Sequence, residues 1–161
     1  MTVQQVILRK MTPAEYVAAT EHREAESVRV LSKALPEEIA RERVRQGTAR
    51  FLPDGVDTVG HHLLMAENRS GETVGNAWVG PDPGQASGSE SSAWLYDINV
   101  FKPFRRLGYG SAVLTAAEAL ISSEGKTALG LNVVGDNEAA IALYHRKGYE
   151  VASMSMRKSI Y

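Results

Sequence analysis

The chain has 161 residues, which suits one domain over residues 1–161 with its own hydrophobic core. Its 18 lysines and arginines stand against 19 aspartates and glutamates, a balance that gives no support for nucleic acid or an anionic membrane as the main partner. There are no cysteines, so disulfides, thiolate metal sites and a cysteine nucleophile are excluded.

Targeting and metal-binding signals are weak in this sequence. Residues 1–5 lack the basic and apolar regions of a signal peptide, and no run of about 18 apolar residues occurs. We therefore expect a cytoplasmic protein without a membrane segment. The sequence has four histidines, His22, His61, His62 and His145. No two of them have the spacing of a helical zinc site, so no metal is expected.

The first fifty residues predict a strand followed by two helices. Residues 6–8 favour a short strand, and residues 12–15 (Thr-Pro-Ala-Glu) form a capping box with proline at the first helical position. The helix that starts there is expected to reach about Ser32. A second helix opens at residues 36–38 (Pro-Glu-Glu), and Gly47 is placed to cap its end.

The middle of the chain predicts three strands. Two of them are expected at residues 61–66 and 73–79, joined by a hairpin turn at residues 68–71 (Asn-Arg-Ser-Gly). Residues 80–92 are small, polar and rich in turn formers, so they are predicted to be a mobile hairpin loop. The third strand is expected at residues 94–100, where aromatic and β-branched side chains favour extended backbone.

This third strand leads into a tight turn and a helix. Gly108 and Gly110 let the backbone bend without a Cβ in the way, and the helix that follows has unpaired N–H groups in its first turn. The positive end of the helix dipole lies there, and Arg105 and Arg106 add full positive charges beside it. The turn therefore predicts a site for a phosphate or pyrophosphate group.

The remaining residues predict helix, strand, helix and strand. Apolar side chains at helical spacing run as far as Gly125, and residues 128–134 are predicted to form a short apolar strand. Residues 136–137 (Asp-Asn) cap a helix that stops at Gly148, and residues 149–158 are predicted to be a last strand. This order of elements is that of an α/β fold with one sheet, which some schemes class as α+β.

Two motifs carry a resemblance to a known family. Arg105-x-x-Gly108-x-Gly110, which follows a strand and opens a helix, resembles the acetyl-coenzyme A motif of the GNAT superfamily of N-acetyltransferases. The family's second motif is resembled, at matching spacing, by Leu131-Asn132-Val133, Asn137, Ala140, Leu143-Tyr144 and Gly148-Tyr149. Together the motifs cover about residues 93–150. The resemblance implies a single mixed sheet of about six or seven strands with about four helices, in which two central parallel strands splay apart near Val100 and Val133.

The resemblance also implies which residues bind acetyl-coenzyme A. The backbone of Val100 would pair with the pantetheine arm like an added strand, and the N–H groups of residues 106–111 would hold the pyrophosphate. Asn137 is an ordinary helix N-cap on its own evidence, and in the family the matching asparagine also bonds the pantetheine arm. The cofactor-binding residues expected on this basis are Asn99, Val100, Arg105, Arg106, Leu107, Gly108, Tyr109, Gly110, Ser111, Asn132, Asn137, Ala140 and Tyr144.

Tyr144 and Asp97 are the candidates for catalysis. The family places a tyrosine beside the acetyl sulfur as hydrogen-bond donor to the departing thiolate, whereas packing on the apolar face of its helix is the other interpretation of Tyr144. Asp97 is the only carboxylate within the strand at residues 94–100. A charged residue in a sheet interior is unusual unless it is paired or functional.

The general base is less well defined than the coenzyme site. Strand alternation places Asp97 on the opposite face from Tyr96, and a bulge would reverse that parity. Where many relatives carry a catalytic glutamate, this chain has Trp94 or Tyr96. Asp97 is therefore either the base or a structural partner for an arginine or a helix terminus, and His61 and His62 are weaker candidates.

The function implied by the resemblance is transfer of an acetyl group from acetyl-coenzyme A to a primary amine of a small molecule or peptide. Attack would be direct, since no cysteine is present to carry the acetyl group. The alternative is a non-catalytic module that binds acyl-coenzyme A as a sensor. No motif in the first two helices specifies the acceptor, and a homodimer is compatible with the resemblance because dimers are common in the family.

Overall fold

The chain folds into two compact units. The computed structural model describes residues 3–84 and 91–160, so residues 85–90 of the loop expected at residues 80–92 lie outside the described residues. The first unit comprises residues 1–131 and the second comprises residues 132–161. The single domain expected over the whole chain stays a prediction.

The order of the elements follows the predicted order up to the last helix. The first unit contains β1 (Ile7–Lys10), α1 (Pro13–Leu31), α2 (Glu37–Phe51), the 3-10 turn η1 (Gly55–Asp57), β2 (His62–Glu67), β3 (Thr73–Pro81), β4 (Ser92–Val100), the 3-10 turn η2 (Lys102–Phe104), α3 (Tyr109–Ser123) and β5 (Ala128–Leu131). The second unit contains α4 (Glu138–Arg146). The four predicted α-helices are confirmed.

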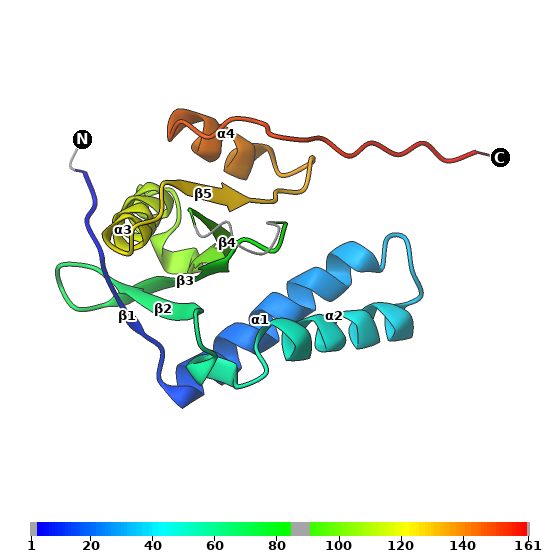
Figure 1. Ribbon diagram of the computed structural model, residues 1–161, viewed down its shortest axis with the longest axis horizontal. Coiled ribbons are helices and arrows are strands. Elements are labelled where there is room, and N and C mark those ends of the chain that lie inside the picture. Colours follow the sequence, from blue (N-terminus) through cyan, green and yellow to red (C-terminus); the bar gives the residue numbers. More distant parts are fainter. Residues whose placement is uncertain (1–2, 85–90, 161) are drawn as a thin grey trace. The chain divides into compact units, whose positions relative to one another are not determined.

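The sheet is open, and its five strands lie in the order β1-β2-β3-β4-β5 (labelled in Figure 1). Neighbouring strands are antiparallel except β4 and β5, which are parallel. The predicted hairpin between β2 and β3 is confirmed. Asn68 Oδ1 accepts hydrogen bonds from the N–H groups of Ser70 and Glu72, both at 3.0 Å, and Gly71 has φ +80°. This φ is left-handed, which explains the glycine.

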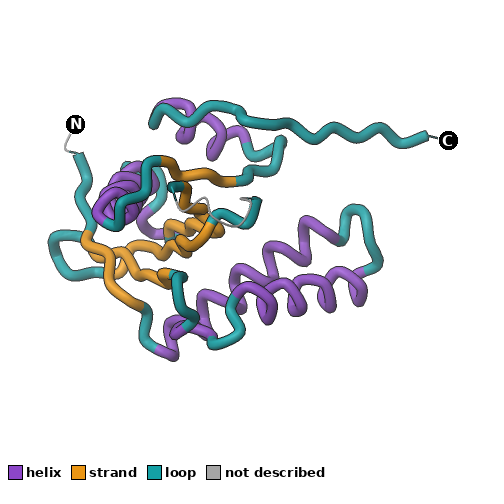
Figure 2. The backbone as a smooth tube through the Cα atoms, viewed as in Figure 1, coloured by secondary structure: helices purple, strands orange, loops and turns teal. Residues whose placement is uncertain are grey.

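The expectation of six or seven strands is wrong, because the described residues form five. Residues 149–158, predicted to be a last strand, make no strand pairing and are drawn as loop in Figure 2. Their apolar side chains Val151, Met154 and Met156 are exposed. Strand propensity measures how well side chains fit a pleated surface, but a strand also needs the N–H and C=O groups of a neighbour.

One predicted helix end is confirmed and another is wrong. At the start of α1, Thr12 Oγ1 accepts from the Glu15 N–H (3.2 Å) and the Glu15 carboxylate accepts from the Thr12 N–H (2.9 Å), which completes the capping box. The predicted end of α2 at Gly47 is wrong, since the helix continues to Phe51. A glycine inside a helix costs about 1 kcal/mol. Packing of Phe51 against the core, followed by the buried Leu52, outweighs that cost.

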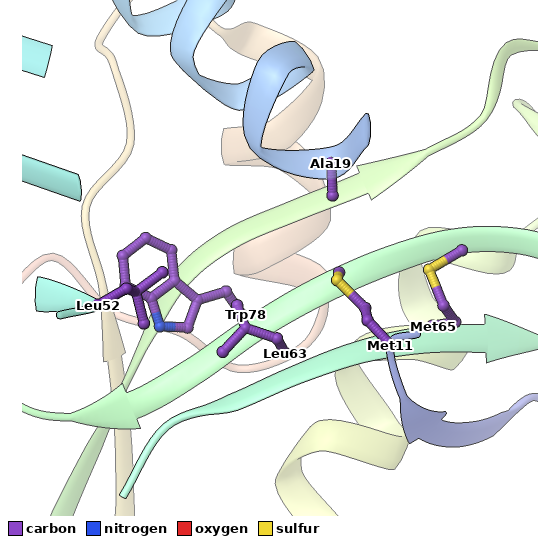
Figure 3. Close-up of a cluster of buried hydrophobic side chains, with 6 residues drawn as sticks. All are labelled: Met11, Ala19, Leu52, Leu63, Met65 and Trp78. Carbon is purple, nitrogen blue, oxygen red and sulfur yellow. The ribbon is translucent and has the colours of Figure 1, made fainter. Parts of the chain in front are cut away.

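Helices cover both faces of the sheet in the first unit (Figure 1). We call the two sides the α1 face and the α3 face. On the α1 face, side chains from α1, β2, β3, the link between β1 and α1, and the residue after α2 form a buried cluster (Figure 3). It consists of Met11, Ala19, Leu52, Leu63, Met65 and Trp78. On the α3 face, the buried side chains of β3, β4 and α3 include Val79, Leu95, Val113 and Leu114. The candidate base lies on the α1 face.

Arg9 connects β1 to α1 and β2. Its guanidinium donates hydrogen bonds to both carboxylate oxygens of Glu15, at 2.7 and 2.8 Å, and its Nε donates to Glu67. The hydrogen bonds from Arg9 are the largest cause that lowers the pKa of Glu15 to about 2. Because the folded pKa lies below the ordinary value of 4.5, this pair stabilises the fold above about pH 4.5 and loses its effect as the pH falls towards 2.

Glu15→Gln is therefore expected to lower the free energy of unfolding by about 1 kcal/mol at pH 7, and by much less at pH 2.5. Glutamine preserves the capping box but cannot pair with Arg9 as an anion. Urea unfolding at both pH values measures the difference. Glu26→Gln is the control, because Glu26 pairs with Arg29 on an exposed surface and should change little at either pH. A Glu15→Gln effect of equal size at both pH values would contradict the argument.

Candidate functional site

Strand β4 separates from β5 part-way along its length. The parallel pairing stops at Leu95 and Leu131, whereas the pairing of β4 with β3 continues to Val100. Within the described residues of the first unit, residues 96–100 therefore have a strand neighbour on one edge. The backbone groups on their other edge can pair with an extended ligand in the manner of an added strand.

The turn between β4 and α3 alternates the sign of its backbone angle φ. The angle is +64° at Arg106 and +87° at Gly108, while Leu107 between them has negative φ. Such alternation turns successive N–H groups towards one concavity, which is an anion-binding nest. The first helical bond of α3 runs from the Ala112 N–H to the Gly108 carbonyl (3.2 Å), so the amides of residues 109–111 precede it. Since the N-cap is a glycine, it has no side chain to cap them.

The two arginines of the motif are placed differently. Arg105 folds back over the end of β4, where its Nε donates to the Val100 carbonyl (2.7 Å) and its Nη2 donates to Asn99 Oδ1 (3.4 Å). It thereby fixes the last residues of the strand. Arg106 lies in the turn itself, with a positive φ that costs a residue with a Cβ on the order of 1 kcal/mol. Backbone strain of this kind is concentrated at functional sites.

The other predicted coenzyme residues of this segment contribute mainly backbone. Leu107 is exposed. Tyr109 is only 7% exposed, and its hydroxyl accepts a hydrogen bond from Asn68 Nδ2 (3.3 Å). The Tyr109 side chain therefore belongs to the core, and only its N–H is available at the turn. Gly110 and Ser111 lie in the first turn of α3.

The second unit contains the remaining predicted coenzyme residues. Asn137 caps α4 as predicted, since its Oδ1 accepts from the Ala140 N–H (3.2 Å), and Asn132 is exposed. The Tyr149 N–H donates to the Tyr144 carbonyl (2.9 Å) in the Schellman motif that ends the helix. The two tyrosine rings pack edge to face, with centroids 5.7 Å apart. Tyr144 thus has a packing role in its own unit, and its role towards a thiolate stays a prediction.

A β-bulge in β4 determines the face of the sheet to which the side chain of Asp97, the candidate base, points. Trp78 of β3 pairs with Asp97 while Val79 pairs with Leu95, so Tyr96 is the extra residue. Directly opposed residues point to the same face, which places Asp97 on the α1 face with Trp78. The Tyr96 ring stacks on the Trp78 ring (4.4 Å, 14°) and lies on that face too. The expectation from alternation that Asp97 and Tyr96 lie on opposite faces is wrong, because the bulge reverses the parity.

Beside Asp97 lies an aromatic cluster that sequence reasoning missed. The Phe51 ring contacts the stacked pair, with centroids 6.5 Å from Trp78 and 5.4 Å from Tyr96. The ring of His61 lies 5.8 and 5.5 Å from the same two rings. The four residues come from α2, the position just before β2, β3 and β4. No spacing in the sequence connects them, so no local signal could have found the cluster.

His61 positions the Trp78 indole. Trp78 Nε1 donates to His61 Nδ1 (2.9 Å), so this nitrogen acts as the acceptor. Burial lowers the pKa of His61, and the neighbouring His62 adds to the effect. The ring fits because residue 80 is glycine, since a Cβ there would lie 2.4 Å from His61 Nδ1. A neutral ring already used as an acceptor is a poor general base, and His61 is better described as a support for Trp78.

The surroundings of Asp97 make its carboxylate more basic. The side chain is half-buried, and loss of hydration raises its pKa above the ordinary value. Electrostatic interactions with Arg23 and His22 on α1 and the hydrogen bond from the Ile98 N–H act in the opposite direction without cancelling it. A raised pKa is the direction that a base for amine deprotonation requires. Asp97 and Arg23 interact through charge and form no ion pair in the described part of the chain.

Trp94 and Tyr96, the two residues expected as candidates for the position of the family's glutamate, have packing roles here. Trp94 pairs with Gly130 of β5, where a Cβ would lie 2.5 Å from the Trp94 ring, so the indole covers this glycine. The Tyr96 hydroxyl donates to the Pro81 carbonyl, which holds the ring in the stack. On β4 this leaves Asp97 as the carboxylate on the α1 face.

Comparison with known proteins decides the family. A model described as the acetyltransferase (GNAT) family matches residues 22–149, which is most of the chain and includes the β4–α3 turn and α4. The chain belongs to the GNAT family. The resemblance drawn from the two motifs is thereby confirmed at the level of the family. The activity that the family indicates for this chain is that of an acetyltransferase.

Individual relatives agree with this assignment. The uncharacterised N-acetyltransferase YdgE of Bacillus subtilis is 28% identical over 131 residues, which are 81% of this GNAT chain and 82% of the relative. The solved structure of YycN from the same organism superposes with a TM-score of 0.87 at 26% identity and covers 98% of this chain and 99% of that one. AAC(6')-Iy, solved with the bisubstrate analogue CoA-S-monomethyl-acetylneamine, has a TM-score of 0.57 at 15% identity over 98% and 99% of the chains, which shows the shared fold.

Two further properties of the GNAT chain concern membranes and metals. None of the helices in the described ranges has the length and apolar character that a bilayer crossing requires. Within the same ranges, no three histidine, aspartate or glutamate side chains are grouped as ligands for a metal ion.

Proposed function

We propose that this chain transfers the acetyl group of acetyl-coenzyme A to a primary amine of a small molecule or peptide. The observation that carries the proposal is the edge of β4 at residues 96–100, which has no strand partner among the described residues of the first unit, followed along the chain by the alternating turn at Arg106 and Gly108. An extended pantetheine arm and a pyrophosphate are joined in the same order in coenzyme A. The bisubstrate analogue bound to AAC(6')-Iy, a protein of the same fold, contains this coenzyme.

In the proposed complex, the N–H groups of residues 106–111 bind the pyrophosphate, and the charge of Arg106 adds to the dipole of α3. The backbone of Val100 pairs with the pantetheine arm, and Arg105 keeps this end of the strand in place. Asn137 adds a hydrogen bond to the arm by its match to the family motif. Each of these proposed contacts with the coenzyme is made either by backbone groups or by a single side chain.

The proposed chemistry is direct attack of the amine on the thioester. An α-amine is neutral about one time in ten at pH 7, whereas a lysine amine is neutral about once in two thousand, so a proton acceptor is needed. Asp97 takes the proton, directly or through a water, and its raised pKa suits this role. Tyr144 donates a hydrogen bond to the departing thiolate. The half-buried basic carboxylate favours catalysis over a module that only binds acyl-coenzyme A.

Thermal unfolding with and without excess acetyl-coenzyme A tests the proposal, followed by an assay of thiol release with a panel of amines. A ligand at about 100 times its dissociation constant adds about 2.7 kcal/mol. For a domain of this size the unfolding midpoint should then rise by roughly 5 to 11 °C. No shift at millimolar acetyl-coenzyme A would refute coenzyme binding, and a shift without thiol release from any amine would favour the binding module.

A further inference from the structure

Arg23 stands over the Trp78 ring on the α1 face. Its guanidinium carbon lies 4.7 Å from the ring centre, within range of a cation–π contact. The side chain is half-buried, and its Nη2 makes a long hydrogen bond of 3.5 Å to Thr20 Oγ1. Within residues 3–84 and 91–160, Arg23 forms no ion pair, whereas Arg29 on the same helix pairs with Glu26 at 3.1 Å. No carboxylate among the described residues therefore uses the Arg23 donors.

Arg23 and Asp97 belong to the same surface. Asp97 is directly opposite Trp78 in the β3–β4 ladder, and Arg23 lies on the ring of that tryptophan. The positive charge of Arg23 acts on the Asp97 carboxyl and opposes the effect of burial. The buried Trp78 ring, on which Tyr96 stacks, thus has one carboxylate and one planar cation beside it, both half-buried.

The neighbouring charges disfavour an acceptor with a second amine. His22 lies within electrostatic range of Asp97, and Arg50 stands 5.7 Å from the centre of the Phe51 ring in the aromatic cluster. Asp82 acts on the Tyr96 hydroxyl, but it already accepts hydrogen bonds from the Ser92 hydroxyl (3.0 Å) and the Gly84 N–H (2.9 Å). A second cation would be repelled by the guanidinium groups, whereas an anion would be attracted.

We infer that the acceptor is an amine with a carboxylate within a few bonds, as in a free amino acid, which binds with its amine at Asp97 and its carboxylate on Arg23. This inference rests on the proposed acetyl transfer. Arg23 acts as a binding residue, because the planar fork of a guanidinium matches a carboxylate with two parallel hydrogen bonds. Its contact with Trp78 holds the fork in place before the acceptor arrives.

The transfer balances with this acceptor. The amine nitrogen forms a bond to the acetyl carbon, and the carbon–sulfur bond of the thioester breaks. One amine proton passes to Asp97 and from there to solvent, and the departing thiolate takes up one proton from solvent to become the thiol of coenzyme A. The products are an N-acetyl amino acid and free coenzyme A, and no oxidant or reductant is required.

The test compares α-amino acids that have apolar or aromatic side chains with their carboxamides as acceptors. Each carboxamide keeps the amine and the side chain of its acid but lacks the negative charge. Thiol release gives kcat/KM for every acid and amide with the wild-type protein, Arg23→Gln, Arg23→Lys and the control Arg29→Gln. The intrinsic reactivity of each amine is the same in all variants, so it cancels when their acid-to-amide ratios are compared. Circular dichroism checks that each variant is folded.

Arg23→Gln is expected to lower the acid-to-amide ratio about tenfold or more, chiefly through the KM of the acids. Arg23→Lys keeps the charge but loses the bidentate hydrogen bonding, so its acid-to-amide ratio should lie between those of Arg23→Gln and wild type. This variant also tests the inference if Arg23→Gln does not fold. Arg29→Gln should match wild type, because its arginine pairs with Glu26 on an exposed surface.

Two outcomes would overturn the inference while leaving the proposed function intact. One is an equal loss for acids and amides in the Arg23 variants, which would make Arg23 a structural residue. The other is the absence of thiol release from every acid although acetyl-coenzyme A still raises the unfolding temperature, which would point to another class of amine. Failure of both the temperature shift and thiol release with all acceptors would refute the proposed function itself.

Discussion

Replacement of Asp97 by asparagine is expected to lower kcat/KM by about 10²- to 10⁴-fold and to raise the unfolding temperature at neutral pH. Asparagine has nearly the same shape as aspartate, but it carries no charge and cannot accept the amine proton. Turnover falls for that reason. Stability rises because a half-buried carboxylate with raised pKa is charged at neutral pH only at a cost in free energy, and the neutral amide does not bear this cost.

The contribution of Asp97 to the stability of the fold changes with pH in a definite direction. The folded protein keeps the Asp97 proton to higher pH than the unfolded chain, whose pKa is near 3.8. Wild-type protein therefore loses stability as the pH rises through the interval between the unfolded and the folded pKa, and Asp97→Asn should lack this loss. Thermal unfolding from pH 4 to 8 measures it. The pH profile of kcat/KM should also lose the acidic limb that Asp97 supplies.

Asp57→Asn is the matched control for this prediction. Asp57 is exposed and pairs with Lys10, so its replacement should change stability by less than about 1 kcal/mol and leave turnover unchanged. Unchanged turnover in Asp97→Asn would exclude Asp97 as the base. A lower unfolding temperature of Asp97→Asn at pH 7 would instead contradict the argument from burial.

The parts of the fold that were predicted correctly from the sequence depend on residues that are close together in the chain. The capping box at the start of α1, the Asn137 cap and the glycine-rich turn at Gly108 each involve groups within three or four positions of one another. Local physical chemistry is sufficient there. The end of α2 was misplaced because the local preference of Gly47 competes with packing of Phe51 against residues far away in the sequence.

The candidate acceptor surface could not be predicted because it depends on strand register. The bulge at Tyr96 exists only relative to β3, and it alone decides that Asp97 and Tyr96 share a face. The position of Arg23 over Trp78 likewise joins α1 to a strand about fifty residues later in the sequence. Sequence pattern identified Asp97 as an unusual residue in a strand, but the direction of its side chain required the pairing.

Gly108→Ala is expected to weaken the binding of acetyl-coenzyme A by about a hundredfold. The added Cβ has room, since the nearest atom would be Gln4 Cγ at 3.6 Å, so the effect comes from the backbone. Alanine at φ +87° costs roughly 1–2 kcal/mol, and relaxation of this angle turns the N–H groups out of the nest. Loss of two amide–phosphate hydrogen bonds, each at least about 1.5 kcal/mol, corresponds to about a hundredfold in affinity. Titration calorimetry measures it.

Gly125→Ala separates this effect from simple destabilisation. Gly125 lies just beyond the other end of α3 with φ +83°, and among the described residues nothing lies within 4 Å of a Cβ placed there. Alanine at Gly125 should therefore lower stability about as much as alanine at Gly108, roughly 1–2 kcal/mol, while the affinity for acetyl-coenzyme A stays at the wild-type value. If both variants lost affinity equally, the weaker binding would reflect strain in α3, and the alternating turn would not be the coenzyme site.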